Sequence, residues 1–170
     1  MTNFYTNVIR NSKAFRSDNR YGGMDLLEPG TRKAVADMVA EAHEEGHDLR
    51  VLETYRSQTR QGKLFMQHFT KLRVVGCHGY GVACDFGVFV DGKYAEDDKP
   101  YRFLKDLARK HGMVSGLDWG HSDGRANTFV DSGHVQRVPI FRQNALFAGT
   151  WYPPETNYDP YQDMKAHGVS

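Results

Sequence analysis

The sequence predicts an α+β domain in which a small, mainly antiparallel sheet has helices packed against it. Apolar residues recur at the helical spacing i, i+3, i+4 in several stretches of the chain. Short segments rich in apolar and β-branched residues lie between these stretches, and the pair Asp91-Gly92 is typical of a tight hairpin turn. Helices and strands do not alternate regularly, so a parallel βαβ sheet is not expected.

Three helices are expected, and each has a recognisable start. The first covers residues 31–45 with Thr31 as its N-cap, Ser57 caps the second, and Pro100 opens the third, which ends at Gly112. The positions expected to face the core recur at helical spacing, namely Val35, Met38, Val39 and Ala42 in the first helix, Leu64, Phe65, His68, Phe69 and Leu72 in the second, and Phe103, Leu104, Leu107 and His111 in the third.

The strands are expected to be short. Residues 49–55 and 83–90 have the apolar content of strands, and the hairpin signal Asp91-Gly92 follows the second of them directly. Residues 113–119 and 134–140 are two further candidates. Such strands suit the small antiparallel sheet of an α+β domain.

Composition narrows the class of protein. The chain has 170 residues, of which 39% are hydrophobic and 25% charged, as in one ordinary globular domain. Its 22 basic and 21 acidic side chains give a net charge of +1, which argues against a protein that coats nucleic acid. Two cysteines, Cys77 and Cys84, are too few for a disulfide framework, and we expect both to be small buried hydrophobes.

Two features of the sequence indicate in which cellular compartment the protein is made and whether it is exported. The sequence has no run of 18 apolar residues, so no membrane insertion is expected. The first fifteen residues, MTNFYTNVIRNSKAF, contain no apolar core of signal-peptide length. We therefore expect synthesis in a cytoplasm without export by the usual route.

One candidate metal motif is the segment His43-Glu44-Glu45-Gly46-His47, which matches the pattern H-E-x-x-H. In that pattern two histidines one helical turn apart bind zinc, and the glutamate between them acts as a base. Here Gly46 lies inside the motif where the helical pattern stops, and both histidines point away from the apolar stripe. We interpret the segment as the solvated end of a helix.

A second candidate site is split along the chain between His78, Asp85 and His134. A catalytic zinc ion needs three protein ligands and one open position for water, and these residues offer two nitrogens and one oxygen. Glycines beside His78 and a Ser132-Gly133 turn before His134 allow the three side chains to converge. Asp131 then has a natural role as a proton acceptor, or as a partner that orients His134. Spacing alone leaves open that these groups are structural.

The pattern His78-x-x-Gly81-x-Ala83-x-Asp85, followed by Asp131-x-x-His134, resembles the signature of VanY/VanX-like zinc peptidases. Within that family it is most similar to the bacteriophage L-alanyl-D-glutamate endopeptidase endolysins. Further matching segments are Tyr55-Arg56-Ser57 with Gln61, Val90-Asp91-Gly92-Lys93 and Asp118-Trp119, so the resemblance covers roughly residues 26–140. It departs at Gly76, where many relatives have a serine. The resemblance implies a Hedgehog/DD-peptidase-like fold and a Zn2+ cofactor.

The resemblance also implies a role for each matching residue. His78, Asp85 and His134 are the implied zinc ligands, and Asp131 is the implied general base. Arg56 is expected to bind a substrate carboxylate or the developing oxyanion, with a structural ion pair as the alternative. The other candidates for substrate contact are Tyr80 and Trp119, for which plain packing is the alternative, and His121, for which a fourth metal position and a surface loop are the alternatives.

The division of the chain follows from these assignments. Residues 1–25 are polar and basic, and we expect a solvated arm, with weak attraction to an anionic cell-wall or membrane surface as the alternative. Residues 26–150 form the expected zinc peptidase domain. Residues 151–170 contain three prolines and are expected to be an extended tail. Its aromatic residues are expected to pack on the domain, with contact to glycan as the alternative, and they are Trp151, Tyr152, Tyr158 and Tyr161.

The predicted function is zinc-dependent hydrolysis of an amide in the peptidoglycan stem peptide, at the L-Ala–D-Glu bond, by a monomeric phage endolysin that reaches the cell wall after release and lyses the host. Bacterial peptidoglycan is the expected partner, without nucleic acid or stable membrane insertion. Two alternatives stay open. One is D-Ala-D-Ala carboxypeptidase or dipeptidase activity at the same site, and the other is a non-catalytic wall-binding phage module.

Overall fold

The computed structural model describes residues 2–119, 131–155 and 157–169. Its sheet has strand order β1-β2-β5-β4, and β3 pairs with the end of β2. Every pairing in it is antiparallel, which confirms the predicted α+β class with a small antiparallel sheet. The strands are β1 Asp48–Glu53, β2 Ala83–Val90, β3 Lys93–Tyr94, β4 Val114–Ser115 and β5 His134–Gln136.

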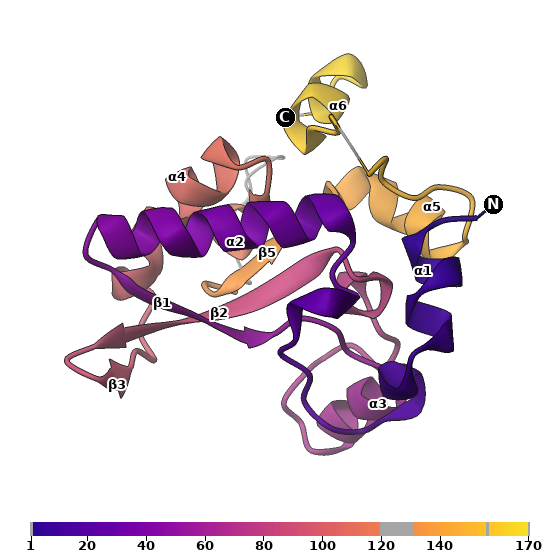
Figure 1. The fold of residues 1–170 in the computed structure, drawn as a ribbon, viewed down its shortest axis with the longest axis horizontal. Helices are drawn as coiled ribbons and strands as arrows, with labels where there is room; N and C mark the ends of the chain where they lie inside the picture. Colours follow the sequence, from indigo (N-terminus) through magenta and orange to yellow (C-terminus); the bar gives the residue numbers. More distant parts are fainter. Residues whose placement is uncertain (1, 120–130, 156, 170) are drawn as a thin grey trace.

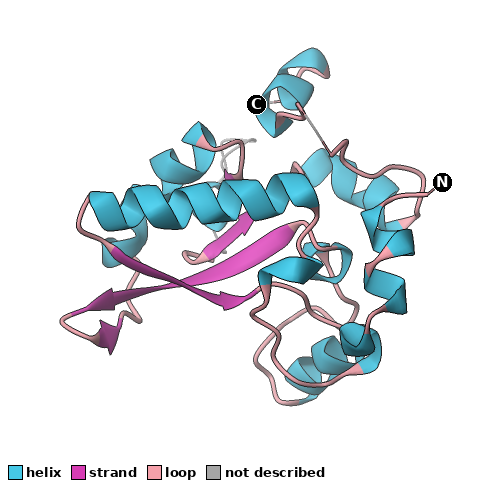
Figure 2. Ribbon diagram, in the orientation of Figure 1, coloured by secondary structure: helices cyan, strands magenta, loops and turns pink. Residues whose placement is uncertain are grey.

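The described residues also form six α-helices, of which α2 is the longest and crosses one face of the sheet (Figures 1 and 2). The helix bounds are α1 Phe4–Asn7, α2 Pro29–Glu44, α3 Gln58–Met66, α4 Arg102–Lys110, α5 Gln143–Phe147 and α6 Pro160–Ala166. No helix in these parts of the chain combines the length and apolar character needed to cross a bilayer.

The helix starts agree only in part with the sequence-based expectation. Helix α2 begins at Pro29, and its N-cap is Glu28 rather than Thr31. The carboxylate of Glu28 accepts hydrogen bonds from the backbone N–H groups of Gly30 and Thr31, so the helix starts two residues earlier than predicted. Ser57 caps α3 as predicted, because its Oγ accepts a hydrogen bond from the Arg60 backbone.

The main hydrophobic core lies between the sheet and helices α2 and α4. Strand β2 contributes Cys84, Phe86 and Val88, which alternate along the strand and are almost completely buried. Because successive side chains of a strand point to opposite faces, Asp85 points to the other face of the sheet. The core therefore fixes the orientation of the strand that carries Asp85.

A second hydrophobic cluster corrects the expectation of a solvated arm. Phe4 and Ile9 of the N-terminal segment are buried against Val82, Val138 and Leu146. Helix α1 and two following short 3-10 helices therefore pack on the rest of the chain, with α1 beside α5 (Figure 1). The apolar residues Phe4, Tyr5, Val8 and Ile9 span less than two helical turns in a polar, basic stretch, so their pattern was too short to reveal their burial.

The C-terminal segment also differs from the expected extended tail, because residues 160–166 form helix α6. Asp159 caps this helix and Pro160 occupies its first turn, a position that suits proline. Arg142 binds Asp163 through two hydrogen bonds of 2.8 Å each, which holds α6 against the region of α5. Proline in this segment thus starts a helix instead of preventing one.

The second predicted helix is shorter than expected, and the prediction that Phe69 and Leu72 lie on its buried side was wrong. Helix α3 ends at Met66, and His68 has a positive φ of 62°, so the helical spacing does not continue. Phe69 and Leu72 are 78% and 60% exposed. The apolar spacing that suggested a longer amphipathic helix therefore belongs to an exposed loop.

Candidate metal centre

Asp85 and His134 face each other across two neighbouring strands. Their Cα atoms are paired in the antiparallel register of β2 and β5, so both side chains point to the same face of the sheet. Gly133 makes this pairing possible, because a Cβ atom there would lie 2.2 Å from the Phe86 carbonyl oxygen. The Phe86 N–H donates to the Gly133 carbonyl at 2.8 Å, which locks the turn onto β2.

His78 reaches the same point from a 3-10 helix, Cys77–Tyr80, that precedes β2. Gly81 ends this helix in the left-handed conformation with φ 71°, where a Cβ atom would lie 2.5 Å from the Leu26 carbonyl oxygen. The chain then turns into β2, and His78 folds back over the strand. This is the loop geometry that the sequence required for His78 and Asp85 to converge.

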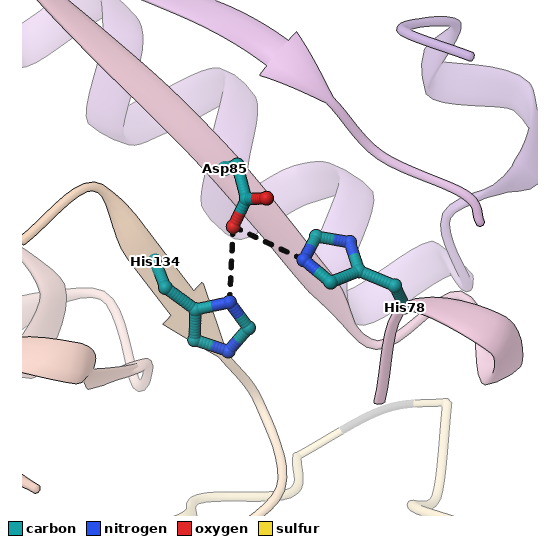
Figure 3. Close-up of side chains that lie close together, drawn as sticks. All are labelled: His78, Asp85 and His134. Atoms are coloured by element: carbon teal, nitrogen blue, oxygen red, sulfur yellow. Dashed lines mark hydrogen bonds and ion pairs between the residues drawn. The ribbon is translucent and has the colours of Figure 1, made fainter. Parts of the chain in front are cut away.

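The three side chains meet at one carboxylate oxygen (Figure 3). Oδ1 of Asp85 lies 3.0 Å from Nε2 of His78 and 3.0 Å from Nδ1 of His134. One ligand atom from each residue lies within 4.8 Å of the others, which is compatible with binding a single ion. Both histidine side chains are 7% exposed and the Asp85 side chain is 26% exposed, so the site is accessible mainly at the carboxylate.

The outer nitrogen of each histidine has a hydrogen-bond acceptor. His78 Nδ1 lies 2.8 Å from the Thr54 carbonyl oxygen, and His134 Nε2 lies 2.9 Å from Oε1 of Gln136. An outer N–H that donates to such an acceptor leaves the inner nitrogen of a neutral imidazole with a lone pair. Three electron-pair donors then converge, an arrangement that is stabilised by a cation at their centre and disfavoured without positive charge.

The electrostatics of the cluster agree with this interpretation. Burial raises the pKa of Asp85, but the charges and hydrogen bonds of His78 and His134 outweigh it and hold that pKa well below its usual value. Burial lowers the pKa of His134, but the Asp85 carboxylate outweighs it, so the net direction is upward. Both shifts reflect the attraction between the Asp85 carboxylate and positive charge on the neighbouring imidazoles.

Arg56 lies beside the His78–Asp85–His134 cluster. Its Nη2 donates to Oδ2 of Asp85 at 3.1 Å, the carboxylate oxygen that faces away from the histidines, and its Nη1 donates to Gln61 at 3.2 Å. Its Nε donates to the buried Glu53, which also binds Arg60 at 2.9 and 2.8 Å. Arg56 is thus a fixed cation next to the cluster, and Glu53 and Arg60 keep it there.

Asp131 begins the turn that leads into β5. Its backbone N–H donates to the Gly116 carbonyl at 3.3 Å, and its carbonyl accepts the His134 N–H at 3.3 Å. Burial raises the pKa of the Asp131 carboxyl, His134 lowers it and the nearby Asp85 raises it, with a net shift upward. Asp131 therefore lies within the electrostatic field of the cluster, and burial favours its protonated form.

The remaining predicted contacts fall in three different places. The Trp119 ring centroid lies 4.8 Å from that of His134, so this tryptophan borders the cluster. The Tyr80 ring instead packs against Tyr5 and Phe147, with centroid distances of 4.8 and 5.6 Å. His121 lies outside the described residues.

The segment His43–His47 does not bring its two histidines together. Helix α2 ends at Glu44, so His47 lies beyond the helix. His43 Nε2 lies 2.9 Å from the Leu49 carbonyl oxygen, and the His47 ring stacks on Phe103 at 3.7 Å. In the residues that the structure describes, the cluster of metal-binding side chains is formed by His78, Asp85 and His134.

Both cysteines are free and lie in different hydrophobic clusters. Cys84 is completely buried on the core side of β2, opposite to Asp85 as expected. Burial raises the pKa of the Cys77 thiol to about 12 and that of Cys84 well above its usual value. Protonated buried thiols of this kind behave as small hydrophobes.

Sequence reasoning did not find the groups that hold the site residues in place. Thr54 and Gln136 accept hydrogen bonds from the imidazoles of His78 and His134, and Glu53 anchors Arg56. Glutamine at position 136 shares a strand face with His134, which follows from the period of two along β5. That spacing was a usable signal, whereas the Thr54 carbonyl carries no sequence signal at all.

Comparison with known proteins concerns the fold. Neither a protein-family model nor a curated protein sequence matches the chain. Among solved structures, the L-Ala D-Glu endopeptidase ChiX of Serratia marcescens aligns with a TM-score of 0.52 at 18% identity, over 71% of this chain and 90% of its own. The LD-carboxypeptidase LdcB aligns with a TM-score of 0.53 at 17% identity, over 72% of this chain and 64% of its own. VanYB in complex with D-Alanine-D-Alanine aligns with a TM-score of 0.51 at 16% identity, over 72% of this chain and 77% of its own.

These likenesses show that the chain has the α+β fold of those peptidases, and the His-Asp-His cluster lies within that fold. More particularly, the chain has the VanY-like peptidase fold. At such low identity the likeness establishes the fold, and the activity has to be argued from the site itself.

Proposed function

We propose that this chain is a zinc-dependent peptidoglycan hydrolase that cleaves the L-Ala–D-Glu amide of the stem peptide. The observation that carries this proposal is the convergence of His78, Asp85 and His134 with their outer nitrogens already bonded to acceptors. A zinc ion would be held by Nε2 of His78, Nδ1 of His134 and the Asp85 carboxylate. When bound, zinc supplies Lewis acidity for the scissile carbonyl and for an attacking water molecule.

Asp131 is the proposed general base. A buried carboxylate with a raised pKa is a better proton acceptor than an exposed one. In the proposed reaction Asp131 takes a proton from the attacking water and passes it to the nitrogen of the leaving amine. The carboxylate ends each cycle deprotonated, so it needs no further proton donor.

Arg56 is the proposed anchor for negative charge on the substrate. Its bonds to Glu53, Gln61 and Asp85 use three of the five N–H groups of a guanidinium. The other two N–H groups suit a carboxylate or the oxyanion that develops during attack. Trp119 beside His134 would form part of the substrate groove, and His121 keeps its proposed substrate contact from sequence alone.

The preference for the L-Ala–D-Glu bond rests on the sequence pattern of the phage branch and on the likeness to ChiX. An endolysin of that kind would act as a monomer on the host cell wall after release. The second candidate function is carboxypeptidase activity, because the TM-scores of LdcB and VanYB, 0.53 and 0.51, each differ by 0.01 from the value for ChiX, 0.52. The fold comparison does not separate these two reactions.

A digest of purified peptidoglycan tests the proposal. The zinc-loaded chain and a chelated sample are incubated with the same wall material, and the fragments are identified by mass spectrometry. A new free amino terminus on D-Glu that depends on zinc is expected. Loss of a terminal D-Ala would assign a carboxypeptidase instead, and no cleavage of several wall types would leave a non-catalytic wall-binding module.

A further inference from the structure

A pocket lies beside the Cys77–Tyr80 turn, which carries His78. It has a volume of about 240 Å³ and lies between the N-terminal segment, the Cys77–Tyr80 turn and residues 146–152. Five of its eleven lining residues are aromatic, namely Tyr5, Tyr80, Phe147, Trp151 and Tyr152. Because aromatic residues make up only 12% of the chain, this concentration is unusual.

The walls of this aromatic pocket are held in a defined arrangement. The hydroxyl of Tyr152 donates to the Tyr80 carbonyl at 2.7 Å, which ties the C-terminal segment to the turn. The Tyr80 ring packs on the rings of both Tyr5 and Phe147, with centroid distances of 4.8 and 5.6 Å. Burial raises the pKa of Tyr80, whose hydroxyl therefore stays protonated. The pocket is thus a part of the fold that exists before any ligand binds.

The lining has the chemistry of a site for a sugar ring. Aromatic rings offer flat apolar faces to the C–H groups of a pyranose. The hydroxyls of Tyr152 and Tyr80 already donate to the Tyr80 and Phe147 carbonyls, so these two residues contribute mainly ring surface. Asn3 and Thr6 in the lining bond to each other as the capping box of α1, and the exposed Arg10 adds guanidinium donors to the pocket. The hydroxyl and amide oxygens of an N-acetylated hexosamine can accept hydrogen bonds from such donors while its C–H face lies on the rings.

The aromatic pocket lies close along the chain to the candidate metal centre, because one 3-10 helix contributes a residue to each. Tyr80 follows His78 by two residues in one 3-10 helix, which advances about 2 Å per residue. In peptidoglycan the stem peptide begins with L-alanine on the lactyl group of N-acetylmuramic acid. A substrate cut at L-Ala–D-Glu therefore has its sugar one amino acid from the reacting carbonyl, about 3.5 Å of extended chain plus the lactyl group. A D-Ala–D-Ala bond lies several residues further away.

We propose that the aromatic pocket binds the N-acetylmuramic acid ring of the substrate and so selects the bond nearest the glycan strand. This inference rests on the proposed peptidase function, which it deepens by naming the substrate as glycan-linked. The N-terminal segment gains a role from it, because Tyr5 and Arg10 belong to that segment. The pocket would also favour polymeric wall over free stem peptide.

The first test measures sugar binding without any hydrolysis. The GlcNAc-MurNAc disaccharide without its peptide is titrated into the full chain, and amide shifts are followed by NMR. Saturable shifts at pocket residues are expected, and Tyr5→Ala should weaken binding about tenfold. Tyr94→Ala is the matched control, because this half-exposed tyrosine lies on the β2–β3 hairpin. Shifts absent at millimolar disaccharide, or located elsewhere, would overturn the proposal.

The second test compares cleavage of two substrates. MurNAc-L-Ala-D-Glu-containing fragments and the same peptide without sugar are digested by the wild-type chain, Tyr5→Ala and Tyr94→Ala. The wild type and Tyr94→Ala should prefer the sugar-linked fragment, and Tyr5→Ala should reduce the ratio of kcat/KM values about tenfold. Equal cleavage of both substrates by the wild type would contradict the sugar site while leaving the peptidase function intact. Disaccharide binding without any cleavage would reject the function and retain the site.

Discussion

His134 and Gln136 lie two residues apart on one face of β5, and the imidazole of His134 is hydrogen-bonded to the Gln136 side chain at 2.9 Å. The amide of Gln136 cannot turn freely, because its Nε2 donates to the Val138 carbonyl at 2.6 Å. Its oxygen is therefore directed at His134 Nε2, which fixes the proton on that nitrogen. Nδ1 is left with its lone pair toward Asp85.

Removing this acceptor should weaken metal binding without removing a ligand. Gln136→Met keeps the shape of the buried side chain, and we expect zinc affinity to fall roughly 10- to 100-fold. Competition with a chelator of known affinity measures the change. Gln67→Met at the exposed end of α3 is the control and should bind zinc normally. Unchanged affinity in Gln136→Met would show that the His134 tautomer is not set by this bond.

The ligand assignment gives a direct test between the two histidine motifs. His134→Ala should abolish zinc retention after dialysis, because it removes one of three converging ligands. His47→Ala should keep full zinc content, since that ring stacks on Phe103 away from the cluster. Zinc is counted by atomic spectroscopy on folded protein. The opposite pattern would move the metal site to the end of α2.

Asp131→Asn separates catalysis from metal binding. The amide cannot accept a proton from water, so turnover should fall about 10²- to 10⁴-fold while zinc content stays at one ion per chain. Asp97→Asn on the exposed loop before α4 is the matched control and should keep full activity. Wild-type turnover in Asp131→Asn would exclude it as the base, and loss of zinc would point to a role in metal binding.

The sequence predicted best where a local pattern decides the structure. Strand β2 was placed at residues 83–90 because its alternation and the Asp91-Gly92 turn are local signals. Both hairpin residues have positive φ angles of 51° and 75°, as a two-residue turn of this kind requires. The burial of Cys84 behind Asp85 followed from the same period of two.

Features that depend on contacts between distant segments escaped prediction. Phe4 and Ile9 are buried only because residues far along the chain, such as Leu146, cover them. Glu53 looks like a surface residue in a strand, yet Arg56 and Arg60 neutralise it in the interior. A charge or a lone apolar residue carries no information about its partner until the fold brings the partner close.

Acid should release helix α6. Arg142 and the Tyr158 hydroxyl bind the Asp163 carboxylate, and the bond to Arg142 is the main cause that lowers its pKa. The pKa of Asp163 is lower in the folded state than in the unfolded state, where it is about 4. The ionised carboxylate therefore stabilises the docking of α6 fully at pH values above about 4, and this stabilisation is lost as the pH falls through the lowered pKa. NMR signals of α6 should therefore stay native at pH 5 and shift only at more acidic pH. Asp163→Asn should loosen α6 already at neutral pH, where the wild-type carboxylate is ionised.

The buried ion pair between Glu28 and Arg137 holds the start of α2 to the C-terminal segment. Their closest atoms are 2.7 Å apart, Glu28 is fully buried, and Arg137 also donates to the Pro154 carbonyl at 2.9 Å. Arg137→Met should reduce the free energy of unfolding by about 3–5 kcal/mol, because it leaves a buried carboxylate without its cation.

The double variant Glu28→Gln/Arg137→Met tests the cause of that loss. It removes the charge together with its partner, so part of the stability should return in urea unfolding. Arg50→Met is the control, because the Arg50–Asp48 pair is exposed and solvent screens it, so the stability should change little. If the double variant were less stable than Arg137→Met, the bonds from Glu28 to the start of α2 would outweigh the cost of its unpaired charge. The helix cap, rather than the ion pair, would then be the main role of Glu28.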